Sequence, residues 1–313
     1  MDISFVIPCY GSEHTIELVV NELRETMARR PEYSYEIVLV NDNSPDQVWT
    51  VIQRLVRKYD NMKGISLARN FGQHAALMAG YRSCKGEIVI SLDDDGQTPA
   101  DEVFLLIDKI NEGYDVVYGS YPEIKQSHFR IFGSWVNEKM VEMLLDKPKE
   151  LKCTSYYAAR RFIIEEMLRY KNSYPYVGGL VLRSTKNIAN VPVHHRARLE
   201  GKSGYSLGKL LALWFNGFTA FSVKPLRVAT VVGFLCALAG LAYGVFMVLR
   251  KLLGYTTVLG YSSLITVILF IGGIIMVLLG IIGEYIGRIY ISLNNAPQYV
   301  IRETIGGNNA NVN

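Results

Sequence analysis

The sequence has few cysteines and none in clusters. Its four cysteines are widely separated along 313 residues, at positions Cys9, Cys84, Cys153 and Cys236. This spacing argues against a disulfide framework and against a cysteine-based metal site, and it is typical of a reducing compartment. Two nucleotide-binding motifs are also missing, because no G-x-G-x-x-G follows the first apolar run and no G-x-x-x-x-G-K-[S/T] occurs. The sequence therefore excludes a dinucleotide-binding fingerprint and a P-loop.

A strong excess of one charge is lacking as well. The chain has 33 Lys and Arg against 29 Asp and Glu, a net charge of +4, which by itself does not predict nucleic-acid binding. Hydrophobic residues make up 50% of the chain, which excludes disorder as the dominant state. The mean hydropathy of +0.14 is high for a fully soluble protein. The apolar excess is concentrated near the C-terminal end.

Two long runs there contain no charged side chain, residues 228–249 and 252–283. A helix that crosses a bilayer needs about 20 apolar residues. A buried helix of a large soluble domain is the alternative, but two such runs in tandem favour a transmembrane hairpin. We place the two helices at about 228–249 and 262–284. Glycines recur within both runs, and small residues of this kind permit close packing of membrane helices or a homo-oligomer.

The segments around the hairpin predict its topology. The N-terminus has no positive region and no long apolar run, so it does not resemble a signal peptide. Basic residues flank both outer ends of the hairpin, which favours a cytoplasmic location for the termini. The segment Leu207–Phe221, "LGKLLALWFNGFTAF", is rich in aromatic residues and predicts a helix in the membrane interface, with a core helix of the soluble part as the alternative.

The N-terminal part alternates apolar runs of strand length with segments of helical periodicity. This alternation predicts a mostly parallel sheet with helices on both faces, an α/β fold. The expected strands are 3–10, 36–41, 64–68, 87–92 and 115–119, and the expected helices are 13–29, 47–59, 71–83 and 102–111. The last residues, 306–313, are expected to be disordered.

Polar residues follow several of these strands, where a parallel sheet binds its ligands. The most prominent group is Asp93-Asp94-Asp95-Gly96-Gln97, directly after a buried strand. Carboxylates that converge on one point repel each other, and a hard cation such as Mg²⁺ or Mn²⁺ relieves that repulsion. An acidic N-cap of the next helix is the alternative. Three consecutive acids exceed what a cap needs, so we predict a metal site.

Several segments together resemble a known family. The sequences "VIPCYGSEHTI", "EIVLVNDNSPD", "LARNFGQHAAL" and "SLDDDGQTP" resemble those of family-2 glycosyltransferases of GT-A fold, a Rossmann-like fold. The later segments "RARLEGKSGYSLGKL", "FSVKPLR" and "GEYIGRIY" are similar to those of polyprenyl-phosphate glycosyltransferases. That group includes dolichol-phosphate mannose synthases and bacterial bactoprenol glucosyl and aminoarabinose transferases. The resemblance runs from Ile3 to about Tyr299.

The resemblance implies a transferase that moves a sugar from a nucleotide-sugar, with uridine as the favoured base, to the phosphate of a membrane polyprenol, with inversion. The residues that match the nucleotide-binding positions are Pro8, Tyr10, Glu13, Asp42 and Asp93. Those that match the positions binding the Mg²⁺ or Mn²⁺ ion and the donor diphosphate are Asp93, Asp95 and Gln97. Asp93, Asp95 and Arg198 carry the expected catalytic roles.

Positions for the phosphates and the acceptor are carried over in the same way. They are Lys125, Arg130, Ser134, Arg198, Ser203 and Tyr205. The implied organisation is a cytoplasmic catalytic domain over 1–205, an interfacial region over 206–225, the two helices within 226–290 and a cytoplasmic tail over 291–313. The implied location is the bacterial inner membrane. The implied partners are a nucleotide-sugar, a polyprenyl phosphate, the bilayer and further copies of the chain.

Two other functions compete with this one. A processive polysaccharide synthase shares the early motifs, but none of the three tryptophans ends a Q-x-x-R-W motif. A membrane-tethered sensor of nucleotide-sugars without catalysis is the second, and the intact acidic group argues against it. A phosphate monoester is mostly dianionic at pH 7, so the acceptor needs no strong base, and the sequence does not indicate a dedicated one.

Overall fold

The structure is a computed structural model that describes residues 1–121, 148, 150–194, 196, 260–293 and 297–307, together with scattered positions between 231 and 253. The chain divides into two compact units. Unit 1 comprises residues 1–206 and 295–313, and unit 2 comprises residues 207–294.

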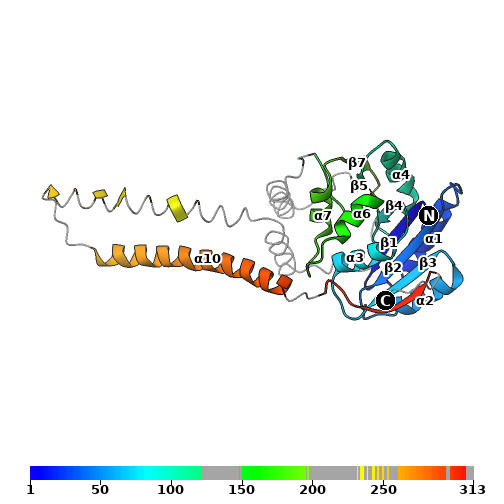
Figure 1. Cartoon of the computed structure of the whole chain (residues 1–313), viewed down its shortest axis with the longest axis horizontal. Helices are drawn as coiled ribbons and strands as arrows, with labels where there is room; N and C mark the ends of the chain where they lie inside the picture. Colours follow the sequence, from blue (N-terminus) through cyan, green and yellow to red (C-terminus); the bar gives the residue numbers. More distant parts are fainter. Residues whose placement is uncertain are drawn as a thin grey trace. The chain divides into compact units, whose positions relative to one another are not determined.

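Unit 1 is built on one eight-stranded sheet with the order β7-β5-β6-β4-β1-β2-β3-β8 (Figure 1). Its strands are β1 Ile3–Cys9, β2 Tyr35–Asn41, β3 Met62–Leu67, β4 Ile88–Ser91, β5 Val116–Ser120, β6 Tyr157–Arg160, β7 Ile188–Pro192 and β8 Ile301–Gly306. The central strands β4, β1, β2 and β3 run parallel, and so do β5 and β7. Strands β6 and β8 are antiparallel to their neighbours.

Helices cover both faces of this sheet. They are α1 Ile16–Met27, α2 Val48–Lys58, α3 Gln73–Ser83, α4 Val103–Asn111, α6 Arg161–Leu168 and α7 Val177–Ser184, and the short 3₁₀ helix η1, Ala100–Glu102, precedes α4. Alternate residues of β1 point to opposite faces. Ile3, Phe5, Ile7 and Cys9 share one buried cluster with residues of α1, α2 and α4. The other face packs on α3 and α6, and α7 packs against these two helices.

Helix α3 approaches the sheet especially closely. A Cβ atom built on Gly80 would lie 2.3 Å from Cγ1 of Val6 in β1, which is far inside van der Waals contact. Glycine at this position therefore lets α3 pack directly against β1 and β2. The close contact lies toward the C-terminal end of α3, and two residues of the candidate site, Gly72 and Gln73, are located at the opposite end.

The α/β class and the helices on both faces are confirmed, and each predicted strand and helix of residues 3–119 is present with small shifts at its ends. The sheet is less parallel than predicted. Strand β6 is inserted between β4 and β5 in the antiparallel direction, and it comes from a part of the chain where the sequence indicated no strand. The register and direction of β6 depend on its pairing with residues far away in sequence, such as the pairing of Arg160 with Ile88.

The end of unit 1 lies beyond the apolar runs in sequence. Residues 301–306 form β8, which pairs antiparallel with β3, as Figure 1 shows beside α2. Ile305 packs on the core, and a Cβ atom on Gly64 of β3 would lie 2.8 Å from Cγ1 of Ile305. The sequence pattern predicts no strand in this segment, and the disorder expected from residue 306 onward is wrong at Gly306, which ends β8.

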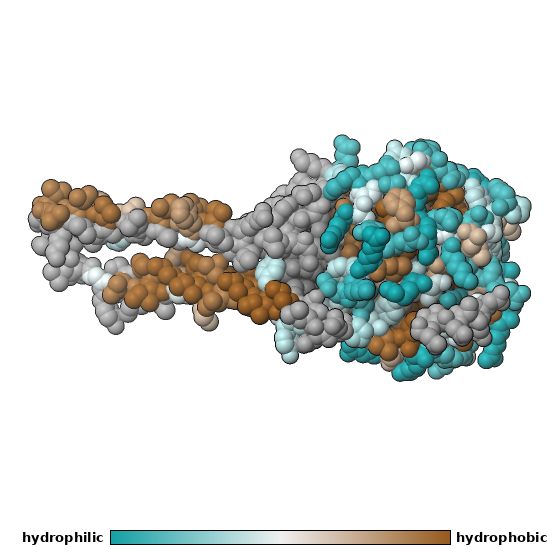
Figure 2. Space-filling view, in the orientation of Figure 1, coloured by the Kyte–Doolittle hydropathy of each residue, from teal (hydrophilic) through white to brown (hydrophobic). Residues whose placement is uncertain are grey.

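Unit 2 contains the long apolar helix α10, Tyr261–Leu293, which includes the second predicted membrane helix. Within the described residues, its segment Phe270–Gly287 is the one stretch long and apolar enough to cross a membrane. Figure 2 shows its surface as almost entirely hydrophobic. The first run is described only in part, with helical residues such as 233–235. A Cβ atom on Gly233 would lie 3.8 Å from Leu278 of α10. Leu207–Phe221 lies outside the described residues.

Candidate active site

The polar residues predicted from the sequence do meet at one edge of the sheet. Strands β4, β1 and β2 are adjacent and parallel, so the loops after them lie side by side at their carboxyl ends. Tyr10 follows β1, Asp42 follows β2, and residues 93–97 follow β4. The backbone N–H of Tyr10 donates to Oδ2 of Asp94 at 2.9 Å, which ties the first and third of these loops together.

Asp42 is buried, with 3% of its surface exposed. The backbone N–H groups of Phe71 and Gly72 donate to its two carboxylate oxygens at 2.7 and 2.8 Å. Burial raises the pKa of Asp42 above its usual value, and the two hydrogen bonds oppose that rise. The carboxylate therefore serves as a fixed anchor between the end of β2 and the N-terminal end of α3.

The loops after β1 and β2 are linked by reciprocal hydrogen bonds. The N–H of Glu13 donates to Oδ2 of Asp46 at 2.9 Å, and the N–H of Gln47 donates to Oε2 of Glu13 at 2.8 Å. Ser44 accepts from the N–H of Gly11 at 2.8 Å and donates to Oδ1 of Asp46 at 2.6 Å. Pro8 is buried in β1, whereas Tyr10, next to this hydrogen-bond network, is 54% exposed. This hydrogen-bond network fixes the two loops and leaves the Tyr10 ring exposed for stacking with a planar ligand.

Asp93 is held by side chains from two other elements. Nε2 of Gln73, at the start of α3, donates to Oδ1 of Asp93 at 2.8 Å. Oγ of Ser155, just before β6, donates to Oδ2. Donors to both oxygens fix the orientation of the carboxylate.

The middle acid of the group has a different role. Asp94 accepts the N–H of Tyr10, and its own carbonyl oxygen accepts a hydrogen bond from Oγ1 of Thr15 at 2.7 Å. Burial raises the pKa of Asp94 to about 6. Of the three consecutive acids, this one joins the acidic loop to the loop before α1, while its neighbours on both sides belong to the site.

Asp95 and Gln97 complete the acidic loop. The N–H of Gln97 donates to Oδ1 of Asp95 at 3.0 Å. Gly96 between them has φ of 74°, a left-handed conformation that glycine adopts without strain. This turn brings Asp95 and Gln97 to the same end of the loop.

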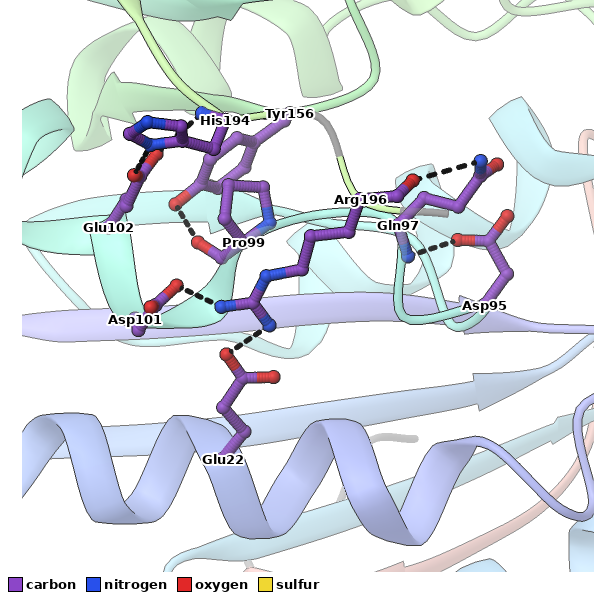
Figure 3. A network of polar contacts seen from close by, with 9 residues as sticks. All are labelled: Glu22, Asp95, Gln97, Pro99, Asp101, Glu102, Tyr156, His194 and Arg196. Atoms are coloured by element: carbon purple, nitrogen blue, oxygen red, sulfur yellow. Dashed lines mark hydrogen bonds and ion pairs between the residues drawn. The ribbon is translucent and has the colours of Figure 1, made fainter. Parts of the chain in front are cut away.

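An ionic network adjoins this loop on the side of Gln97 (Figure 3). Arg196, beyond β7, donates to Oε1 of Glu22 in α1 at 2.7 Å and to Oδ1 of Asp101 in η1 at 2.5 Å. Its backbone carbonyl accepts from Nε2 of Gln97 at 3.4 Å. His194 pairs with Glu102 through Nδ1, and its N–H donates to the same carboxylate at 2.8 Å. This pairing raises the pKa of His194.

The structure adds residues to the site that the sequence patterns did not assign to it. Asp94, Ser155, Gln73 and Arg196 all contact the acidic loop or one of its members. Asp94 was visible as part of the acidic run. Gln73 and Arg196 lie within segments that resemble the family, but neither was assigned a role. Ser155 carried no local signal, because Asp93, which it binds, is distant in the sequence. Of the predicted site residues, Lys125, Arg130, Ser134, Arg198, Ser203 and Tyr205 lie outside the described residues.

The ligand chemistry of the acidic loop fits a hard divalent cation. Asp93, Asp95 and Gln97 offer carboxylate and amide oxygens, the ligands that Mg²⁺ and Mn²⁺ prefer. In the described parts of the chain, no three carboxylate, imidazole or thiol groups form a complete cage. Such an incomplete set suits Mg²⁺, which takes one or two carboxylates and fills its remaining positions with water and substrate phosphate.

Comparison with known proteins connects this site to a family. A model of glycosyl transferase family 2 matches residues 4–175, and a model of the GtrB C-terminal hairpin matches residues 224–289. The glycosyltransferase YkcC of Bacillus subtilis is 32% identical over 97% of this chain and 94% of its own length. The undecaprenyl-phosphate 4-deoxy-4-formamido-L-arabinose transferase of Photorhabdus laumondii is 32% identical over 99% of this chain and 96% of its own.

Solved structures show the same fold. Glucosyl-3-phosphoglycerate synthase of Mycobacterium tuberculosis in complex with UDP has a TM-score of 0.52 and 18% sequence identity, with 70% of this chain and 78% of that chain covered. A complex of the same enzyme with Mn²⁺, UDP-glucose and phosphoglyceric acid has a TM-score of 0.51. At this identity the likeness concerns the GT-A fold alone.

A mixed sheet with an acidic loop after β4 is the architecture of a GT-A glycosyltransferase, and the chain belongs to glycosyl transferase family 2. Its nearly full-length similarity to undecaprenyl-phosphate sugar transferases, together with the hairpin match, confirms the resemblance to the polyprenyl-phosphate branch of that family.

Proposed function

We propose that this chain transfers a sugar from a nucleotide-sugar, a uridine diphosphate sugar, to the phosphate of a membrane polyprenol, with inversion at the anomeric carbon. The observation that carries the proposal is the position of the Asp93–Gln97 loop and of Asp42 at the carboxyl ends of the two strands that flank β1. The same chain contains an apolar helix and matches, over nearly its whole length, transferases that are named for undecaprenyl phosphate.

The edge divides into two regions with different tasks. The hydrogen-bonded loops around Glu13 and Asp46, together with the separately anchored Asp42, are suited to a nucleoside. They offer fixed polar groups and the exposed Tyr10 ring. The acidic loop is suited to the diphosphate, but only through a cation, because carboxylates and phosphates repel each other. Asp93, Asp95 and Gln97 would hold Mg²⁺ or Mn²⁺, which as a Lewis acid stabilises the departing nucleoside diphosphate.

The reaction needs orientation more than proton transfer. The acceptor phosphate is mostly dianionic at pH 7 and can attack the anomeric carbon directly. The bond between that carbon and the donor diphosphate breaks as the new bond forms on the opposite face. The task of the protein is to hold the two anionic reactants in line. Gln73 and Ser155 contribute by fixing the Asp93 carboxylate.

A single-turnover assay with labelled donor and undecaprenyl phosphate tests this function. The donors to compare are UDP-glucose, UDP-N-acetylglucosamine, GDP-mannose and a formyl-aminoarabinose nucleotide. We expect one labelled lipid-phosphate sugar per enzyme. A growing polymer would identify a processive synthase, and binding of donor without any transfer would identify a sensor. Loss of transfer in excess chelator is expected, and full activity there would contradict the metal assignment.

The same proposal includes a location and an organisation. The catalytic domain over 1–205 and the tail over 291–313 face the cytoplasm at the bacterial inner membrane, and the interfacial region and hairpin lie between them in sequence, in a homo-oligomer. Cysteine labelling in intact cells provides the test. We expect Thr257→Cys to react with an impermeant reagent and Asn308→Cys to remain protected. The reverse pattern would contradict the topology.

A further inference from the structure

The segment after the membrane hairpin makes an irregular pairing with the sheet. Ser66 of β3 pairs with Glu303, but the next residue, Leu67, pairs with Ile301. Arg302 is therefore the extra residue of a β-bulge. A bulge redirects a side chain and interrupts the ladder, and bulges are frequent beside active sites.

The bulge directs Arg302 to the end of β3. Its Nη2 atom donates to the carbonyl oxygen of Ala68 at 2.9 Å. The N–H of Ala68 donates to the carbonyl oxygen of Val300 at 2.8 Å. Both backbone polar groups of Ala68 are thus bound by the segment 297–307, which we name the C-terminal strap.

Ala68 stands directly before the segment that binds Asp42. Residues 69–72 connect Ala68 to α3, and the N–H groups of Phe71 and Gly72 are the donors to the Asp42 carboxylate. The carbonyl oxygen of Gly72 accepts the N–H groups of Ala75 and Ala76 at 3.0 and 3.1 Å, so this end of the segment is tied into the first turn of α3. The strap therefore fixes one end of this short segment, and α3 fixes the other.

Other contacts anchor the strap itself. Ile305 packs against Gly64 and Ile52, and a Cβ atom on Gly306 would lie 2.4 Å from Cγ1 of Val56. Before the bulge, Nε2 of Gln298 donates to the carbonyl oxygen of Tyr170, beyond α6, at 2.6 Å. The strap is held on both sides of Arg302, so the bulge has a defined position from which to hold Ala68.

We infer that Arg302 is a positioning residue of the donor site: from the bulge in β8, together with the carbonyl of Val300, it fixes Ala68 and thereby the backbone donors that hold Asp42. The inference rests on the proposed function in so far as Asp42 contacts the nucleotide. It assigns a role in donor binding to a segment that follows the membrane hairpin in sequence.

The test compares Arg302→Met with Ile305→Ala in the full chain. Arg302→Met keeps most of the stem and removes the donor, whereas Ile305→Ala weakens the anchoring of β8 without touching Ala68. The first measurement is hydrogen exchange of the Phe71 and Gly72 amides relative to that of Ile90 in β4, with no ligand present. The second is the Kd of UDP by calorimetry, with GDP in parallel, and the third is Tm.

For Arg302→Met we expect exchange at Phe71 and Gly72 to accelerate about three- to tenfold, the range for loss of one hydrogen bond, while Ile90 and Tm change little. The Kd of UDP should weaken by a similar factor, and Arg302→Lys should restore part of both effects. For Ile305→Ala we expect a lower Tm with no selective change at these two amides.

Unchanged exchange at Phe71 and Gly72 in Arg302→Met would overturn the inference. An equal selective change in Ile305→Ala would also overturn it, because the effect would then belong to strand pairing in general. Failure of the native chain to bind either UDP or GDP would contradict the proposed donor site instead. The exchange measurement would still decide whether Arg302 positions the segment.

Discussion

Asp42 and Asp93 follow two strands that both neighbour β1, yet they are held in different ways. Asp42 is buried and receives two backbone N–H groups. Asp93 is half-buried and receives the side chains of Gln73 and Ser155. Backbone donors depend on the conformation of a loop, whereas side-chain donors depend on the identity of particular residues. Single substitutions of neighbouring side chains should therefore weaken the Asp93 region directly and reach Asp42 only through the backbone.

Helix α3 serves both carboxylates. Gly72 at its N-terminal end contacts Asp42, and the next residue, Gln73, contacts Asp93. The two regions are thus separate in chemistry but share one rigid element. Substitutions in the two regions should therefore differ in the size and the kind of their effects.

Asp95→Asn should have the largest effect, because it removes a negative ligand of the proposed metal with little change in shape. We expect the transfer rate to fall at least about a hundredfold, which corresponds to about 2.7 kcal/mol of barrier. The measurement is kcat across a titration of Mn²⁺ and Mg²⁺. Asp108→Asn, on the outer surface of α4, is the matched control. Native activity in Asp95→Asn at ordinary metal concentration would contradict a metal role for this residue.

Asp42→Asn tests the backbone-held carboxylate. One of the two N–H donors, from Phe71 or Gly72, would then face an amide NH₂ group, and a buried donor would lose its partner. We expect a loss of about 1.5–3 kcal/mol in the free energy of unfolding, with weaker donor binding. Chemical denaturation and nucleotide calorimetry measure the two effects. Unchanged stability would mean that the pocket does not depend on these two hydrogen bonds.

His74 makes the stability of the shared helix sensitive to pH. It is largely buried, its Nδ1 atom has no hydrogen-bond partner among the residues that the structure describes, and its ring packs edge-on against Tyr176. Burial lowers the pKa of His74 from 6.5 to about 4. Below pH 6.5 the unfolded chain gains a proton that the folded chain does not accept until near pH 4. Stability is therefore lost as the pH falls through this range.

The loss attributable to His74 should reach about 2 kcal/mol at pH 5. Denaturant unfolding of the native chain and of His74→Phe, measured from pH 7.5 to 4.5, isolates this contribution. The difference between their unfolding free energies should change over that range. A constant difference would exclude His74 as its source.

Ser155→Ala tests the side-chain-held carboxylate. Asp93 would lose the donor on its Oδ2 atom while the backbone stays in place. We expect kcat to fall about five- to tenfold, the order of one charge-assisted hydrogen bond, with little change in nucleotide affinity. Ser184→Ala, which removes a hydroxyl bonded within α7, provides the control. Equal effects of the two substitutions would show that Ser155 acts through general stability.

Arg196→Met should have the smallest effect. Arg196 pairs with Glu22 and Asp101 at a partly exposed position, where ion pairs contribute about 0–1 kcal/mol. Its backbone contacts to Gln97 do not depend on the side chain. We expect kcat to change by no more than about threefold. Arg30→Met, which breaks the surface pair with Asp108, is the control, and a tenfold larger loss at Arg196 would give this network a role in the reaction.

The sequence by itself determined the alternating strands and helices up to residue 119 and the identity of the acidic loop. These features depend on local periodicity and on residues that are consecutive or nearly so, such as Asp93, Asp95 and Gln97. Local apolar length likewise determined α10. Such patterns can be recognised without knowledge of the fold, because the side chains that produce them are neighbours in the chain.

Which distant residues contact the acidic loop, or the segment next to Asp42, depends on the tertiary structure. Ser155 reaches Asp93, Arg196 reaches Gln97, and Arg302 reaches Ala68 across long stretches of sequence. Strand β6 entered the sheet antiparallel, and β8 joined its edge, because strand pairing satisfies backbone groups with partners that the local pattern does not specify. Contacts of this kind depend on where the folded backbone brings two segments together, and that position is a property of the whole sheet.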